Sequence, residues 1–210
     1  MESYHVISGI KIKGTNIISV ANGDSIFEKQ GTVDGACGPY SLFMTLKILG
    51  ELSQTDVNDP DSIDKRRSAY KFMSRINKLK GLIIGGTYLR NLYDLINDNF
   101  ITKLETDWSQ KKNHDLISFI VGSLEENKPT IIKVDFTSGA HWMVAVGYST
   151  NEKGKHNKLL FLDPSGEKPT FSPWNSVLDI STKRKSEFPY NWTTAGYNVS
   201  LEEALSISHK

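Results

Sequence analysis

The segment Asp34-Gly35-Ala36-Cys37-Gly38-Pro39-Tyr40-Ser41-Leu42 contains the single cysteine of a chain of 210 residues. Pro39 suits the first turn of a helix, where its missing N–H has no partner to lose. Gly50 follows the apolar run, and glycine is the usual residue just after a helix. The segment therefore predicts a helix over residues 39–49 with Cys37 at its entrance. Its core stripe at helical spacing is Leu42, Phe43, Leu46 and Leu49.

Cys37 is a candidate nucleophile because of this position. The thiolate is the reactive form of cysteine, and the unpaired N–H groups and positive dipole end of a helix N-terminus favour an anion. The backbone N–H of Cys37 can also donate to an oxyanion that develops on an attacked carbonyl. Gly35 and Gly38 flank the cysteine and leave room for a substrate backbone. The alternative is an inert core cysteine, although flanking glycines favour an exposed turn.

Two residues far downstream are candidates to complete a catalytic group. His141 follows a glycine loop and opens an apolar strand expected over residues 140–148, so its ring can reach across a cleft. Asp163 ends a strand expected over residues 159–163. If these strands pair, Asp163 lies beside His141 and accepts a hydrogen bond that fixes the imidazole. We therefore predict a catalytic triad of Cys37, His141 and Asp163; the alternatives are a structural histidine and an ordinary Asp-Pro turn.

The order of the apolar patterns predicts an α+β fold, with a helical subdomain packed on an antiparallel sheet. We expect one catalytic domain over residues 1–210, with its helical part at about 28–127 and its sheet part at about 128–200. Residues 5–20 are expected to form short strands or an extended N-terminal arm. Helices are expected over residues 39–49, 62–79, 87–98 and 114–126, strands over 130–136, 140–148, 159–163 and 193–199, and shorter helices over 172–180 and from 201 onward.

Composition excludes several classes of protein. The formal net charge is +1, which gives no electrostatic reason to expect a nucleic-acid partner. One cysteine excludes an internal disulfide framework and a cysteine-rich zinc site, and we expect neither a metal nor a cofactor. The N-terminus lacks a secretory signal pattern, and no apolar run approaches the roughly 20 residues that span a bilayer. We expect a soluble protein without a membrane span that is made in the cytoplasm and stays there, or is secreted without a cleaved signal.

The Cys-Gly-Pro helix start, the His-Trp strand and the Leu-Asp-Pro strand end together resemble the papain-like cysteine peptidase superfamily. The nearest pattern is that of its C39-like and AvrRpt2-like branches, and the resemblance covers residues 28–180 as ordered landmarks. It implies a papain-like fold, a thiolate–imidazolium pair and an upstream glutamine in the oxyanion hole. Gln30 is the candidate, although it lies seven positions before Cys37, where the family usually shows six. We place Gly35, Gly38 and Trp142 at the substrate cleft.

The residues leave three functions open. The default is a thiol peptidase that acts on a protein or peptide substrate. The same chemistry on a glutamine side chain gives a deamidase, or a transglutaminase-like enzyme when an amine replaces water. Bacterial toxins and effectors of this superfamily act in that way on host proteins, and the Lys-, Asn- and Ile-rich composition suits such an effector. The third function is a papain-like domain that binds peptides without catalysis, against which the intact Cys37, His141 and Asp163 argue.

Overall fold

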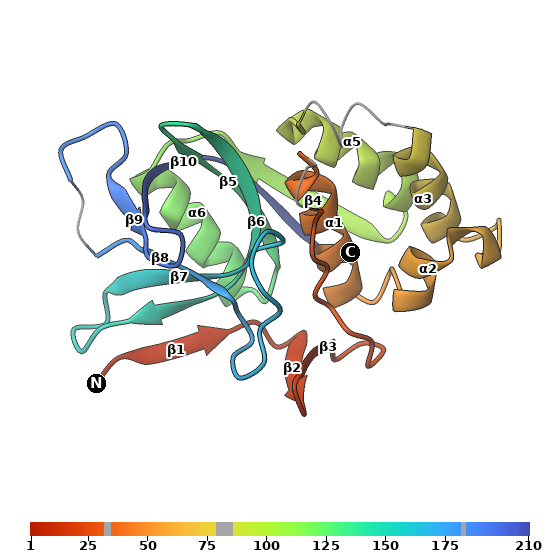
Figure 1. Cartoon of the computed structure of the whole chain (residues 1–210), viewed down its shortest axis with the longest axis horizontal. Helices are drawn as coiled ribbons and strands as arrows, with labels where there is room; N and C mark the ends of the chain where they lie inside the picture. Colours follow the sequence, from red (N-terminus) through yellow and green to blue (C-terminus); the bar gives the residue numbers. More distant parts are fainter. Residues whose placement is uncertain (32–34, 79–85, 182–183) are drawn as a thin grey trace.

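The structure is a computed structural model that describes residues 1–31, 35–78, 86–181 and 184–210. Three short strands come first, and helices and strands follow in the order seen in Figure 1. The N-terminal strands are β1 (Ser3–Val6), β2 (Ile10–Lys13) and β3 (Asn16–Ser19). The helices are α1 (Cys37–Ile48), α2 (Gln54–Asn58), the 3-10 helix η1 (Pro60–Ser62), α3 (Ser68–Lys78), α5 (Leu89–Phe100) and α6 (His114–Glu125). The remaining strands are β4 (Leu104–Ser109), β5 (Thr130–Phe136), β6 (Gly139–Thr150), β7 (His156–Leu162), β8 (Ser176–Asp179), β9 (Tyr190–Trp192) and β10 (Tyr197–His209).

Six strands form a closed antiparallel barrel. The order runs β6-β5-β10-β9-β8-β7, and β7 pairs with β6 again to close the ring. Strand β1 is added on β6 and β4 on β10. The expected helical subdomain on an antiparallel sheet is therefore wrong. Bulges between Ala145 and Gly147 and between Leu201 and Glu203 accompany the closure, since a bulge bends its strand and increases the twist.

Two segments expected to be helices are strands. Within residues 172–180 the structure has β8, and residues 201–209 belong to β10. In β10 the buried residues Leu201, Ala204 and Leu205 have the three- and four-residue spacing of a helix face. The bulge after Leu201 inserts an extra residue into the strand, which produces that spacing without a helix. Residues 193–196, expected to begin a strand, form the turn between β9 and β10 instead, and β4 lies inside the part expected to be helical.

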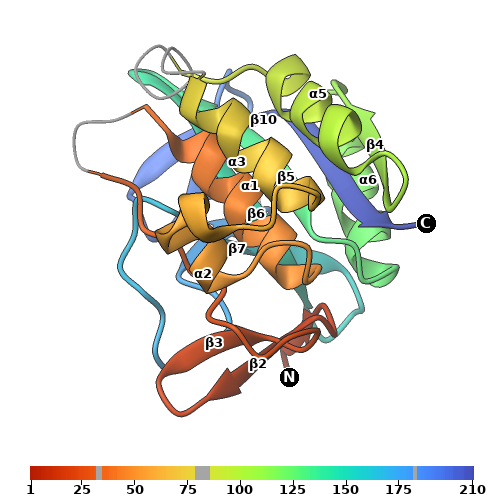
Figure 2. The same cartoon turned by 90° about the vertical axis from the view of Figure 1, so that its right-hand side faces the viewer.

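The helix expected over residues 39–49 is confirmed as α1, which packs against β6 and β5. Every residue of α1 except Tyr40 is buried, because α2, α3 and α5 lie on the side of α1 away from the barrel (Figures 1 and 2). Helix α6 also packs against the barrel, where it contacts β10, β6 and β5. The helix expected over residues 62–79 appears as α3, and its expected last residue lies outside the described ranges.

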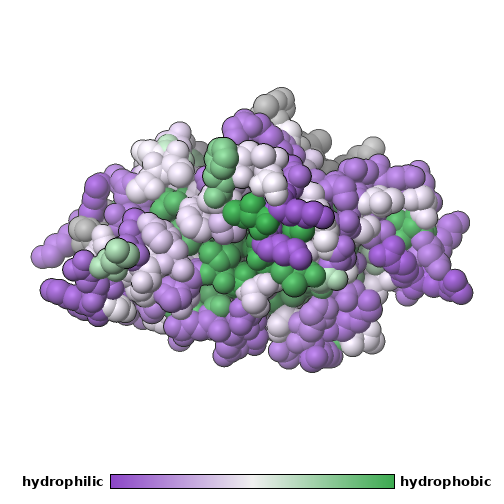
Figure 3. Space-filling model, turned by 90° about the horizontal axis from the view of Figure 1, so that it is seen from below, coloured by the Kyte–Doolittle hydropathy of each residue, from purple (hydrophilic) through white to green (hydrophobic). Residues whose placement is uncertain are grey.

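The surface is mostly hydrophilic. Seen from below, polar side chains surround an apolar area at the middle of that face (Figure 3). Strand β1 lies close against β6, because a Cβ at Gly147 would come within 2.3 Å of the carbonyl oxygen of His5. In the parts of the chain that the structure describes, no helix has the length and apolar character needed to cross a membrane.

Candidate active site

Cys37 is the first residue of α1 and is 9% exposed. Ala36 precedes it as the N-cap residue and makes no side-chain cap hydrogen bond, and the first turn contains no acidic residue. The thiol therefore lies at a helix N-terminus whose partial positive charge no carboxylate of that turn offsets. One turn further on, Ser41 donates its hydroxyl to the carbonyl oxygen of Trp142 at 3.2 Å. This bond ties the start of α1 to the strand that carries His141.

His141 lies on β6 and Asp163 directly follows β7, the strand that pairs with β6. The two side chains are about 10% exposed, and Nε2 of His141 lies 2.7 Å from Oδ1 of Asp163. The thiol of Cys37 lies near His141 and is one of the groups that raise the pKa of its ring. Because Nε2 faces Asp163, Nδ1 is the ring nitrogen left for the thiol. The structure thus brings Cys37, His141 and Asp163 together, in the order in which the sequence analysis placed them.

The electrostatics of the group favour a charged imidazole. Burial by itself lowers the pKa of His141, but the hydrogen bonds and charges of Asp163 and Cys37 raise it to about 9. For Asp163 burial acts in the opposite direction and raises the pKa. The charge and hydrogen bond of His141 and the two donors of Ser165 outweigh burial and hold the pKa of Asp163 below its ordinary value. At neutral pH the pair is therefore an imidazolium beside a carboxylate.

One face of the His141 ring is covered by an aromatic side chain. Trp192 of β9 stacks on it with the ring centroids 5.5 Å apart and the planes 18° from parallel. The indole N–H of Trp192 donates to Ser176 at 2.6 Å, which fixes the ring plane. A cover of this kind keeps water from the His141–Asp163 hydrogen bond, and such a bond is stronger in a site of low dielectric constant. No sequence signal connects Trp192 with His141, since the contact is made across the barrel between β9 and β6.

The backbone of Gln30 lies close to Asp163. Its backbone N–H donates to the carbonyl oxygen of Pro164 at 2.9 Å, one residue beyond Asp163. Its side-chain oxygen Oε1 is buried and has no hydrogen-bond partner among the described residues. A buried, unpaired amide oxygen is rare in folded proteins, and this oxygen is a hydrogen-bond acceptor. Residues 32–34, between Gln30 and Cys37, lie outside the described ranges.

Two of the three residues expected at the substrate cleft, Gly38 and Trp142, contact Thr87. Trp142 is 3% exposed, and its indole N–H donates to the carbonyl oxygen of Thr87 at 2.9 Å. Gly38 is also buried, and a Cβ there would lie 2.7 Å from Cβ of Thr87. Gly38 and Trp142 therefore hold Thr87 close to the start of α1. Gly35 is partly exposed beside Cys37. A place for these residues in the cleft stays a prediction.

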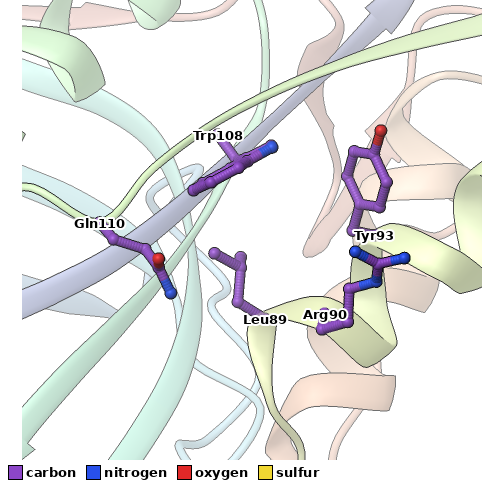
Figure 4. A pocket seen from close by; sticks show the side chains of 5 residues that line it. All are labelled: Leu89, Arg90, Tyr93, Trp108 and Gln110. Atoms are coloured by element: carbon purple, nitrogen blue, oxygen red, sulfur yellow. The ribbon is translucent and has the colours of Figure 1, made fainter.

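A pocket of about 360 Å³ lies between α5 and the end of β4. It is lined by Leu89, Arg90, Tyr93, Trp108 and Gln110, and Figure 4 shows the Trp108 and Tyr93 rings around it with Leu89 between them. None of the predicted site residues lines it. Among the described residues, no group of three His, Cys, Asp or Glu side chains is placed to hold a metal ion.

Comparison with known families identifies the kind of protein. Residues 23–199 match the model of the Peptidase_C39 like family, so the chain belongs to this family. The match spans Gln30, Cys37, His141 and Asp163, and it confirms the resemblance to the C39-like branch of the papain-like cysteine peptidases. The family is of the cysteine-peptidase type. None of the curated proteins matches the chain in sequence.

Proposed function

We propose that the protein is a thiol peptidase and that residues 1–210 act as one catalytic domain. In this mechanism Sγ of Cys37 attacks the carbonyl carbon of a peptide bond, and a C–S bond forms as the carbonyl oxygen becomes an oxyanion. The N–H of Cys37 and the side-chain amide of Gln30 donate to that oxyanion. Nδ1 of His141 gives its proton to the leaving amine as the C–N bond breaks. Water, deprotonated by Nδ1, then attacks the thioester, releases the acid and restores the thiolate.

The observation that carries the proposal is the imidazole of His141 between Asp163 and the thiol of Cys37 at a helix start. An imidazolium beside a cysteine lowers the cost of forming the thiolate. Asp163 is bonded to Nε2 and holds the ring, which leaves Nδ1 as the nitrogen that serves the sulfur in this mechanism. A binding module needs neither a buried carboxylate–imidazole pair nor a cysteine beside that pair. This is why we favour an enzyme over a peptide-binding domain without catalysis.

Alkylation of Cys37 tests the thiolate–imidazolium pair. Iodoacetamide at about pH 6, well below the ordinary thiol pKa of about 8.5, is expected to modify Cys37 rapidly. His141→Ala is expected to slow the reaction to that of a free thiol, and Cys37→Ala to abolish labelling. His114→Ala is the matched control, because His114 is an exposed histidine at the start of α6. Equal rates in the wild type and in His141→Ala would contradict the proposal.

Intact-mass analysis of a mixture of unfolded proteins and peptides after incubation separates the activities. Fragments that are absent with Cys37→Ala are expected for a peptidase. Unfragmented substrates that gain the mass difference between an acid and an amide would point to a glutamine deamidase. Adducts with an added amine would point to transamidation. Those two outcomes would replace peptide hydrolysis with the toxin-like or effector-like reaction on a host protein, while Cys37, His141 and Asp163 would keep their roles.

A further inference from the structure

The backbone of Asp163 is held by a side chain outside the triad. The pairing of β7 with β8 ends at Phe161, opposite Ser176. Asn175, the residue before β8, donates its backbone N–H to the carbonyl oxygen of Phe161 at 3.0 Å. Its side chain continues the ladder: Oδ1 accepts the N–H of Asp163 at 2.7 Å, and Nδ2 donates to the carbonyl oxygen of Asp163 at 2.9 Å. The carboxamide thus takes the place of a peptide group in a neighbouring strand.

The turn after Asp163 is shaped around this carboxamide. Nδ2 of Asn175 also donates to the carbonyl oxygen of Glu167 at 3.0 Å, and the N–H of Gly166 donates to that of Asp163 at 3.2 Å. A Cβ at Gly166 would lie only 2.8 Å from Nδ2. Glycine at this position therefore allows the carboxamide to lie inside the turn and to bond both ends of it.

The fixed backbone of Asp163 limits the directions in which its carboxylate can point. Oδ1 accepts the N–H of Ser165 at 2.8 Å and its hydroxyl at 2.7 Å, in addition to the bond with His141. With the backbone N–H and C=O both fixed, the carboxylate is free only in its side-chain torsions, of which χ1 takes one of three staggered positions. The direction of Oδ1 toward His141 therefore depends on the carboxamide behind it.

We propose that Asn175 is a positioning residue of the triad, whose carboxamide fixes the backbone of Asp163 so that Oδ1 faces Nε2 of His141. This inference rests on the proposed function, in which the His141–Asp163 pair acts on Cys37. A side chain that only stabilised the turn would change the stability of the protein and leave His141 unaffected. A positioning side chain also sets how strongly Asp163 holds the protonated ring.

An NMR titration of the histidine rings in the full chain measures that effect without a substrate. The chain has five histidines, and the signals of His141 are those lost in His141→Ala. The wild-type ring is expected to titrate at about 9. Asn175→Ala is expected to lower the midpoint by about one unit, which is a roughly tenfold fall in the ratio of imidazolium to imidazole at a given pH. Asn157→Ala is the matched control, because its carboxamide contacts Glu2 and Ser149 near the other end of β7.

A double-mutant cycle with Asp163→Ala decides whether Asn175 acts through Asp163. In the Asp163→Ala protein, Asn175→Ala is expected to cause no further shift of His141. An equal shift with and without Asp163, or a shift as large in Asn157→Ala, would overturn the inference. Should Asn175→Ala fail to fold, Gly166→Ala replaces it, because the added Cβ displaces Nδ2. The expected shift has the same sign, and an unchanged midpoint overturns the inference.

The result also separates this inference from the proposed function. If His141 of the wild type titrates at the ordinary value of about 6.5 and Cys37 shows the reactivity of a free thiol, both proposals fail. If the wild type behaves as proposed and Asn175→Ala leaves His141 unchanged, the positioning role alone is wrong.

Discussion

Gln30 is proposed to stabilise the oxyanion without contributing to the formation of the Cys37 thiolate. Its backbone is anchored to Pro164, while its side-chain oxygen is buried without a partner among the described residues. An amide group with an unmade hydrogen bond costs free energy in the resting protein. The oxygen is an acceptor, so in the proposed mechanism the amide nitrogen Nε2 is the donor to the oxyanion, and a donor placed in advance needs no rearrangement.

Gln30→Ala is expected to lower kcat/KM about a hundredfold to a thousandfold, the range found when one oxyanion donor is removed. The rate at which iodoacetamide alkylates Cys37 should stay within about twofold, because that displacement forms no oxyanion. Gln110→Ala serves as the control, since Gln110 bonds Glu203 on the surface. The two rates are measured on the same preparations. A parallel fall in turnover and alkylation would mean that Gln30 supports the thiolate and not the oxyanion.

At the scale of the elements, α1 carries Cys37 at one end and a buried cation at the other. The side chain of Lys47 is fully buried and donates to Glu28 at 2.5 Å and to Gln54 at 2.7 Å. Burial lowers the pKa of Lys47, and Glu28 acts in the opposite direction. Glu28 lies two residues before Gln30. The ion pair thus joins the helix of the proposed nucleophile to the segment of the proposed oxyanion donor.

Lys47→Met is expected to destabilise the fold by about 3–5 kcal/mol, because it leaves the carboxylate of Glu28 buried without its charged partner. The double variant Glu28→Leu with Lys47→Met removes both charges and is expected to recover most of that loss. Urea unfolding of the two proteins and the wild type gives the free energies of unfolding. A Lys47→Met protein as stable as the wild type would show that the pair contributes nothing to the fold.

The elements also show what the sequence can and cannot predict. The helix at Cys37 was predictable because Pro39, the apolar spacing and Gly50 are local signals. The pairing of His141 with Asp163 followed from two adjacent apolar strands. In β10 a bulge gives the buried residues the spacing of a helix face, so the apolar pattern predicts a helix where the structure has a long strand. No local signal indicates Asn175 or Trp192, because Asn175 acts through a side-chain contact across a turn of 12 residues and Trp192 through a contact between strands distant in the chain.

At the scale of the whole molecule, barrel closure determines the site. β6 is paired on both sides, with β5 and with β7, and the ring returns to it through β10, β9 and β8. Through this ring, Trp192 of β9 reaches His141 of β6, and the turn before β8 reaches Asp163. Closure of this kind depends on contacts between residues far apart in sequence, which is why the apolar patterns alone predicted an ordinary sheet beneath helices.

The buried pair makes the stability of the molecule depend on pH. The pKa of His141 rises from its ordinary 6.5 to about 9 on folding, so its contribution is complete below about pH 6.5 and is lost as the pH rises through about 9. The pKa of Asp163 is lowered, so its contribution is present above its ordinary pKa and is lost as the pH falls through the lower folded value. The pair therefore stabilises the fold across neutral pH and weakens at both extremes.

Urea unfolding of the wild type and His141→Gln across the alkaline range measures this contribution. We expect the difference in free energy of unfolding to be largest between about pH 5 and pH 6.5 and to shrink by roughly 3 kcal/mol by about pH 9, since glutamine does not titrate. His114→Gln is the control, because His114 is exposed at the start of α6. Its difference from the wild type should stay flat over the same range. A flat difference for His141→Gln as well would mean that folding does not raise the pKa of His141, and the proposed imidazolium at neutral pH would then have no basis.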